Sequence, residues 1–100
     1  MIEQYTGLNS LNGISLVMLS AEGCPFCNRT LKALNKLYSQ APYINYYILD
    51  VIKSKNLLTT FKKYFDGGVP MLFLFDDKKI LRYTSGEKSL SELKEFILLQ

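Results

Sequence analysis

The sequence predicts a single α/β domain over residues 1–100, with helices on both faces of a central mixed sheet of four to five strands. Two observations lead to this prediction. Short apolar and β-branched runs alternate along the chain with stretches in which apolar residues recur at helical spacing. The length of 100 residues leaves no room for a second domain of ~150 residues, and a hydrophobic fraction of 48% is ample for one packed core.

The first half of the chain predicts a strand, a helix and a second strand. Residues 14–19 are an apolar run that is too short for a helix and fits a strand buried on both faces. A helix follows, and its apolar positions are Leu31, Leu34, Leu37 and Tyr38. Pro42 ends this helix, and residues 46–51, aromatic and β-branched, form the second strand. Because a helix joins them, the two strands should be parallel. Residues 1–13 are predicted to hold a short strand or a helical turn.

The second half predicts a helix, a β-hairpin and a last helix. The apolar positions of the first of these helices are Leu57, Leu58, Phe61, Tyr64 and Phe65. It ends at the glycine pair that begins at Gly67, since glycine readily adopts the left-handed conformation. Residues 69–75 and 80–84 are strands whose short connection permits only antiparallel pairing. Ser89 and Glu92 form a capping box, which opens the last helix.

Composition and charge argue against several classes of partner. The net charge is +3, and the densest basic stretch consists of Lys53, Lys55, Lys62 and Lys63. We interpret this stretch as a solvated helix face, so no nucleic-acid partner is expected. No run of about 18 apolar residues is present, and residues 1–7 lack the features of a signal peptide. We therefore expect a cytoplasmic monomer that carries neither a metal nor a cofactor.

Both cysteines of the chain lie where the first strand gives way to the first helix. Cys24 and Cys27 are separated by Pro25 and Phe26. The first turn of a helix exposes free N–H groups and the positive end of the helix dipole, which lower the pKa of a thiol. Pro25 suits the first helical position, where its missing N–H costs nothing. The spacing predicts Cys24 as a nucleophile near the surface and Cys27, one turn deeper, as the thiol that resolves a mixed disulfide.

Three other interpretations of the cysteine pair stay open. A zinc site needs two more ligands, and the chain has no histidine and no further cysteine. An iron–sulfur cluster shared between two chains would need thiols from outside. A structural disulfide across so short a loop would remove little entropy from the unfolded chain. A CxxC beside a βαβ pattern favours a redox pair over these three.

Four segments together resemble one family. The segment Ala21–Cys24 resembles the thioredoxin run Ala-Glu-Trp-Cys, and Cys24–Cys27 resembles the glutaredoxin run Cys-Pro-Tyr-Cys. The segment Tyr64–Phe75 resembles the part of thioredoxin in which a helix ends and a cis-proline opens the third strand, and Ser91–Ile97 resembles its last helix. Over residues 14–99 the chain is identified as a member of the thioredoxin superfamily, which implies the thioredoxin-like fold.

The resemblance implies the activity of a thiol–disulfide oxidoreductase and the roles of four residues. Cys24 matches the attacking thiol and Cys27 the resolving thiol. Pro70 matches the cis-proline that faces the disulfide. Val69 matches the residue whose backbone N–H and C=O pair with an extended substrate strand.

The resemblance also implies the partners. Protein disulfides are the expected clients, and a thioredoxin reductase-type protein is the expected electron donor, with glutathione as the alternative donor. Pro25 and Phe26, between the two cysteines, are candidate client contacts. Phe26 has a second interpretation, in which it packs on the loop before Pro70.

Some positions depart from the family patterns. Met18 stands where thioredoxin has a buried aspartate, and Gly23 stands where it has a tryptophan. Lys53 and Lys55 are candidates for a compensating charge. Glutaredoxins usually have a Gly-Gly pair followed by acidic residues after the cis-proline strand, but residues 84–88 contain one glycine. Two alternatives therefore remain, a glutathione-dependent reductase and a non-catalytic binding domain of the same fold.

Overall fold

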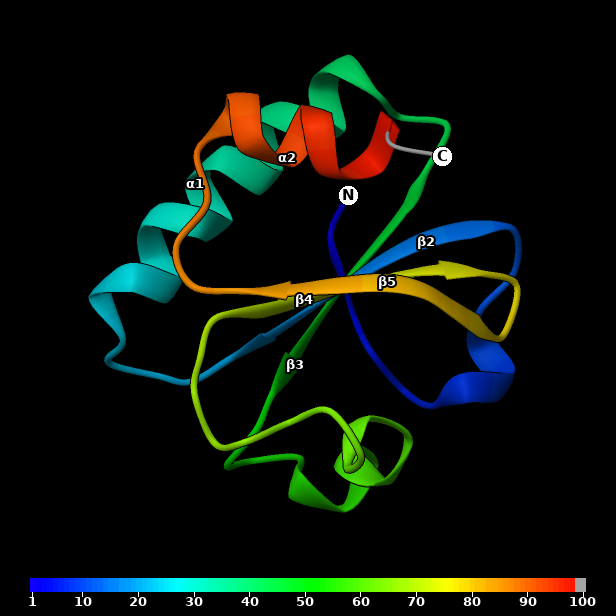
Figure 1. Cartoon of the computed structure of the whole chain (residues 1–100), viewed down its shortest axis with the longest axis vertical. Helices are drawn as coiled ribbons and strands as arrows, with labels where there is room; N and C mark the ends of the chain where they lie inside the picture. Colours follow the sequence, from blue (N-terminus) through cyan, green and yellow to red (C-terminus); the bar gives the residue numbers. More distant parts are fainter. Residues whose placement is uncertain (99–100) are drawn as a thin grey trace.

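The computed structural model describes residues 1–98 (Figure 1), so the last two positions of the predicted domain lie outside the described residues. The strands are β1 (Glu3–Gln4), β2 (Ile14–Ser20), β3 (Asn45–Asp50), β4 (Met71–Asp76) and β5 (Lys79–Ser85). The helices are α1 (Pro25–Gln40), α2 (Leu90–Leu98) and the 3₁₀-helices η1 (Leu8–Ser10) and η2 (Lys55–Phe61). The predicted α/β class and the order of elements are confirmed. Both structures predicted as alternatives for residues 1–13 occur, as β1 and η1.

The five strands form one mixed sheet in the order β1-β3-β2-β4-β5. As predicted, β2 and β3 are parallel, and the hairpin of β4 and β5 is antiparallel. Ser20, the last residue of β2, pairs with Asp50 of β3, while Leu19 pairs with Met71, the first residue of β4. The segments that follow β2, precede β4 and follow β5 therefore meet at one edge of the sheet.

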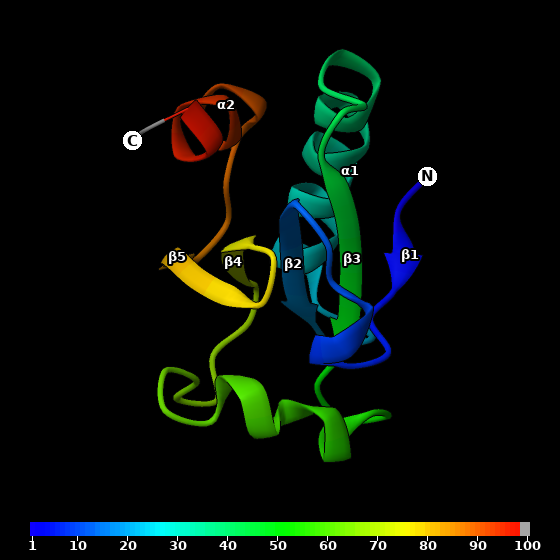
Figure 2. The same cartoon turned by 90° about the vertical axis from the view of Figure 1, so that its right-hand side faces the viewer.

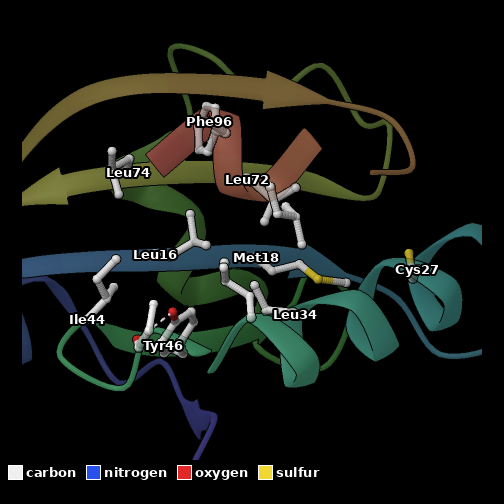
Figure 3. Packing of buried hydrophobic residues seen from close by; sticks show 12 residues of the cluster. Leu16, Met18, Cys27, Leu34, Ile44, Tyr46, Leu72, Leu74 and Phe96 are labelled. Carbon is white, nitrogen blue, oxygen red and sulfur yellow. Dashed lines mark hydrogen bonds between the residues drawn. The ribbon is translucent and has the colours of Figure 1, made fainter. Parts of the chain in front are cut away.

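Both faces of the sheet are covered, but by different elements. Figure 2 shows α1 and α2 side by side above the sheet and η2 below it. Alternate residues of β2 serve the two faces, because successive side chains of a strand point in opposite directions. Leu16 and Met18 pack beneath α1 and α2 (Figure 3), whereas Val17 and Leu19 pack with η2. All four side chains are fully buried, so β2 is buried on both faces as predicted.

The predicted helix over residues 57–65 is wrong in type and extent. The structure has a seven-residue 3₁₀-helix, η2, followed by a turn. Adjacent threonines, Thr59 and Thr60, have low α-helix propensity, and the side chain of Ser54 makes no capping hydrogen bond at the start of η2. Phe61 is nevertheless fully buried, with its ring centroid 4.7 Å from that of Phe73. The apolar side of η2 therefore packs in the core although the segment is not α-helical.

The strand predicted over residues 69–75 is β4, and it begins two residues later than predicted, at Met71 instead of Val69. Pro70 has no N–H to donate to a neighbouring strand, so the ladder starts after it. Gly67 adopts a φ of 100°, the left-handed conformation expected at the end of the preceding turn. Among the helices within residues 1–98, none has both the length and the apolar character needed to cross a membrane.

Candidate functional site

Cys24 occupies the N-cap position of the 16-residue helix α1. Its backbone is extended (φ −97°, ψ 107°), and Pro25 follows at the start of the helix, as the sequence predicts. The backbone N–H of Cys27 donates a hydrogen bond to Cys24 Sγ over 3.1 Å. The first turn of α1 contains no acidic side chain. The sulfur of Cys24 therefore occupies the positive end of the helix dipole without a competing carboxylate.

The two cysteines differ sharply in burial. Cys24 is half-buried, whereas only 1% of Cys27 is exposed, and Cys27 packs in the cluster beneath α1 (Figure 3). Their Cα atoms are 5.2 Å apart, and the two sulfur atoms form a disulfide. The predicted placement, with Cys24 outermost and Cys27 one turn deeper, is confirmed. An incoming reagent therefore reaches Cys24 first.

The segment before β4 lies at the same edge of the sheet as the cysteines. The Val69–Pro70 peptide bond is cis, as the resemblance implies. Pro70 is buried, and its carbonyl accepts a hydrogen bond of 2.9 Å from the Gly86 N–H. Val69 is half-buried and packs against the cluster that also contains Cys24 and Cys27. Within residues 1–98, neither the N–H nor the C=O of Val69 is engaged in a hydrogen bond. Both groups are therefore available to a bound strand.

Two contacts that were not predicted from the sequence join the loop after β5 to α1. Arg29 Nε lies 3.0 Å from Glu87 Oε2 in an exposed ion pair. The N–H of Lys88 donates to Thr30 Oγ1 over 3.1 Å, and the side chain of Thr30 is fully buried. Because Gly86 binds Pro70, this loop connects the helix of the cysteines to the segment of Val69. A buried threonine on a helix needs a polar partner, but the sequence does not indicate which residue provides it.

Phe26 is exposed beside the disulfide. The solvent reaches 54% of its surface, and the guanidinium of Arg29 lies over its ring, 5.1 Å from the centroid. Its aromatic ring makes no pairwise contact with another ring among the described residues. Phe26 and Arg29 thus form a small apolar and cationic surface next to Cys24.

The charged groups on the other side of Cys24 lie at the surface. Lys53 Nζ is 2.7 Å from Glu22 Oε2, and both side chains are largely exposed. The backbone N–H groups of Lys53 and Ile52 donate to Asp50 and lower the pKa of its carboxyl. Lys55 lies in η2, on the opposite face of the sheet from α1. The two lysines proposed as compensating charges therefore do not enter the cluster around Cys27.

Where thioredoxin has a buried aspartate, this chain has the apolar side chain of Met18. Met18 is fully buried in the same cluster as Cys27. Its neighbours in the sheet are Ile48 on β3 and Leu72 on β4. Cys27 therefore shares its buried cluster with Met18, where thioredoxin has a carboxylate.

Comparisons with known proteins reveal similarity at the level of structure. No protein-family model matches the sequence, and no curated protein matches it. A thioredoxin from Halobacterium salinarum is 23% identical with a TM-score of 0.80, and the alignment covers 96% of this chain and 88% of the other. Mitochondrial thioredoxin 3 from Saccharomyces cerevisiae is 18% identical with a TM-score of 0.80 and coverages of 96% and 92%. A thioredoxin from Fasciola hepatica is 21% identical with a TM-score of 0.74 and coverages of 87% and 80%. The chain therefore has the thioredoxin fold.

Proposed function

We propose that this protein is a thiol–disulfide oxidoreductase that reduces disulfides in client proteins through Cys24 and Cys27. The observation that carries this proposal is the position of Cys24 Sγ at the N-cap of α1, where it accepts the Cys27 N–H. A thiolate at this place is stabilised by the hydrogen bond and by the helix dipole, so the pKa of Cys24 should lie below the free value of about 8.5.

The reaction proceeds in two exchanges. The Cys24 thiolate attacks one sulfur of the client disulfide, forms a mixed disulfide and expels the other client sulfur as a thiolate. Cys27 then loses its proton, attacks Cys24 Sγ and releases the second client thiolate. The client gains two electrons and takes up two protons, and the protein is left with the Cys24–Cys27 disulfide.

Client binding in this proposal uses the free backbone groups of Val69. An extended client strand pairs with this N–H and C=O as a short strand addition, which needs little sequence preference. Phe26, Pro25 and Pro70 form the apolar surroundings of the attacked bond. Half-burial of Cys24 beside an exposed phenylalanine supports access by a protein surface.

Several polar groups that a small peptide such as glutathione could use are already engaged. The Gly86 N–H binds the Pro70 carbonyl, Glu87 pairs with Arg29, and the Ser89 N–H binds Glu92. This arrangement supports a protein client over glutathione. We accordingly propose a flavin-dependent reductase of the thioredoxin type as the donor of electrons, in a reducing compartment such as the cytoplasm.

The test is insulin reduction, followed by turbidity, with two sources of electrons. NADPH with a thioredoxin-type reductase should drive a faster reaction than NADPH with glutathione and glutathione reductase. The opposite ranking would place the protein among glutathione-dependent reductases. Absence of turnover with both systems, and with excess dithiothreitol, would indicate a binding domain without catalytic activity.

The reduction potential of the cysteine pair tests the direction of the reaction. A reductase requires a potential near or below the cytosolic glutathione potential of about −220 to −260 mV. Equilibration of the protein with glutathione buffers, followed by alkylation and mass measurement, gives this value. A potential close to about −120 mV, as in strong thiol oxidants, contradicts the proposed direction.

A further inference from the structure

A pair of apolar hollows lies at the end of the sheet opposite the cysteines. The larger, of about 270 Å³, is lined by residues that include Ile14, Tyr43, Leu74, Leu81, Ile97 and Leu98. The smaller, of about 170 Å³, shares Tyr43, Ile97 and Leu98 with it. We call the two together the distal groove. Ile14 begins β2 and Ser20 ends it, so the groove and the disulfide are separated by about 20 Å. Figure 3 shows Leu74 and Ile44 far from Cys27 within the same cluster.

The distal groove gathers exposed apolar side chains. Of the eight large apolar side chains exposed among residues 1–98, four line this groove. Tyr43 is 75% exposed, Leu98 65%, Leu81 46% and Ile14 37%. Single exposed apolar residues are ordinary on a protein surface, but a contiguous group around a hollow is typical of an interaction site.

Among residues 1–98, every charged side chain that lines the distal groove is basic. Arg82 lines the larger hollow and Lys94 the smaller. Arg82 Nη1 donates to the Phe96 carbonyl over 2.7 Å, which holds the guanidinium in place and uses one of its five N–H groups. Within residues 1–98, neither Arg82 nor Lys94 forms an ion pair. The groove therefore presents a fixed guanidinium edge, which suits a carboxylate.

We propose that the distal groove is a docking site for an acidic, apolar segment of a partner protein. Two large apolar side chains of that segment fill the two hollows, and a carboxylate binds the free edge of Arg82. A second copy of this chain fits poorly, because a symmetric contact through the groove would place Arg82 and Lys94 against the same cations. Since the groove and Cys24 lie at opposite ends of β2, a docked partner leaves the disulfide accessible.

The test is a selection from random peptides. Peptides of about 12 residues, which span about 18 Å as a helix, are displayed on phage and selected on the oxidised wild-type chain. The library contains no cysteine, so capture through a disulfide is excluded. We expect enriched peptides to combine two large apolar residues with at least one Asp or Glu. Their synthetic versions should bind at least about tenfold more weakly to the Tyr43→Ser and Arg82→Gln variants.

Two matched variants serve as controls. Ile52 is 71% exposed, about as much as Tyr43, but does not line the groove, so Ile52→Ser should bind the peptides as wild type does. Lys32 and Lys94 are both exposed helix lysines, and only Lys94→Gln should weaken binding. Circular dichroism confirms that each variant is folded.

Other results would overturn the docking site. These are a selection without an enriched family, enriched peptides without acidic residues, and peptides that depend on Phe26 instead of Tyr43. Concentration-dependent dimerisation abolished by Tyr43→Ser would show that a second copy occupies the groove. Binding to vesicles rich in phosphatidylserine that is lost in Arg82→Gln would show a lipid surface as the occupant.

Discussion

The N-termini of α1 and α2 are capped in different ways. At α1, Cys24 Sγ accepts the Cys27 N–H, and no acidic side chain lies in the first turn. At α2, Ser89 Oγ accepts the Glu92 N–H over 3.2 Å, and Glu92 Oε1 accepts the Ser89 N–H over 2.9 Å. The second end is a complete capping box that satisfies its own donors. The first end has a neutral sulfur, a weak acceptor, in the place of an oxygen.

This difference distinguishes a helix end that is already compensated from the one at which we propose a reactive thiol. The carboxylate of Glu92 already compensates the positive end of α2, and the hydrogen bonds at Ser89 lower the pKa of that carboxylate. At α1 the same compensation is provided only when Cys24 becomes a thiolate. The helix end therefore favours ionisation of the thiol, and the proposed reactivity of Cys24 rests on this preference.

The largest expected effect is that replacing Cys24 abolishes the activity without lowering the stability of the fold. The Cys24→Ser variant should lose insulin reduction by more than about a thousandfold, because no thiolate remains to attack the client. Its stability should equal or exceed that of the reduced wild type by up to about 1 kcal/mol, since serine is a preferred N-cap residue. Turbidity assays and urea unfolding in dithiothreitol measure the two quantities.

The matched variant for this experiment is Cys27→Ser. It keeps the attacking thiol, so it should accumulate mixed disulfides with insulin that are visible by mass spectrometry, whereas Cys24→Ser should accumulate few. Equal trapping by both variants would contradict the difference in roles between the half-exposed and the buried cysteine.

Much of the fold was predictable because it follows from local patterns. The apolar run of β2 and the helical period of α1 both report burial directly, and the capping box before α2 fixes the start of that helix. The type of η2 was not predictable in this way. Leu57, Leu58 and Phe61 face one side in either kind of helix, and the choice between them depends on backbone hydrogen bonds that a pattern of side chains does not encode.

The candidate site was predictable only in part, for a related reason. Cys24, Cys27 and Pro70 belong to short motifs, so their neighbourhood follows from the sequence around them. The contacts of Arg29 with Glu87 and of Thr30 with Lys88 each join residues 58 positions apart. A single sequence carries no signal that pairs such residues. The distal groove was missed as well, because the lining of its larger hollow alone comes from five separate segments.

The second prediction concerns the order of alkylation in the reduced protein. Iodoacetamide should modify Cys24 at least about tenfold faster than Cys27, because Cys24 is half-exposed and its thiolate is stabilised at the N-cap. The rate at Cys24 should rise with pH along a titration whose pKa lies below about 8.5. Peptide mapping by mass spectrometry assigns the rates. A faster reaction at Cys27 would reverse the proposed roles.

The third prediction moves a thiol from one helix end to the other. In a chain with Cys24→Ser and Cys27→Ser, the additional change Ser89→Cys places a thiol at the N-terminus of α2. Its pKa should be higher than that of Cys24, because the carboxylate of Glu92 disfavours a second anion there. Adding Glu92→Gln to this variant should lower the pKa of the introduced thiol. Absorbance of the thiolate at 240 nm against pH measures both values. If Glu92→Gln leaves the pKa unchanged, the carboxylate does not distinguish the two helix ends.

The smallest expected effect is a dependence of stability on pH at the end of α2. Hydrogen bonds from the Ser89 backbone and side chain lower the pKa of Glu92 in the folded state below its ordinary value of 4.5. The stabilisation from the ionised carboxylate is therefore complete above that value, and it is lost as the pH falls through the folded pKa. Glu92→Gln should lower the melting temperature slightly at pH 7, and the difference from wild type should shrink towards pH 3. Glu95→Gln, which changes a carboxylate of α2 outside the capping box, should not reproduce this dependence. A difference between Glu92→Gln and wild type that stays constant with pH would show that the box stabilises α2 through hydrogen bonds alone, without the charge that makes the two helix ends unlike.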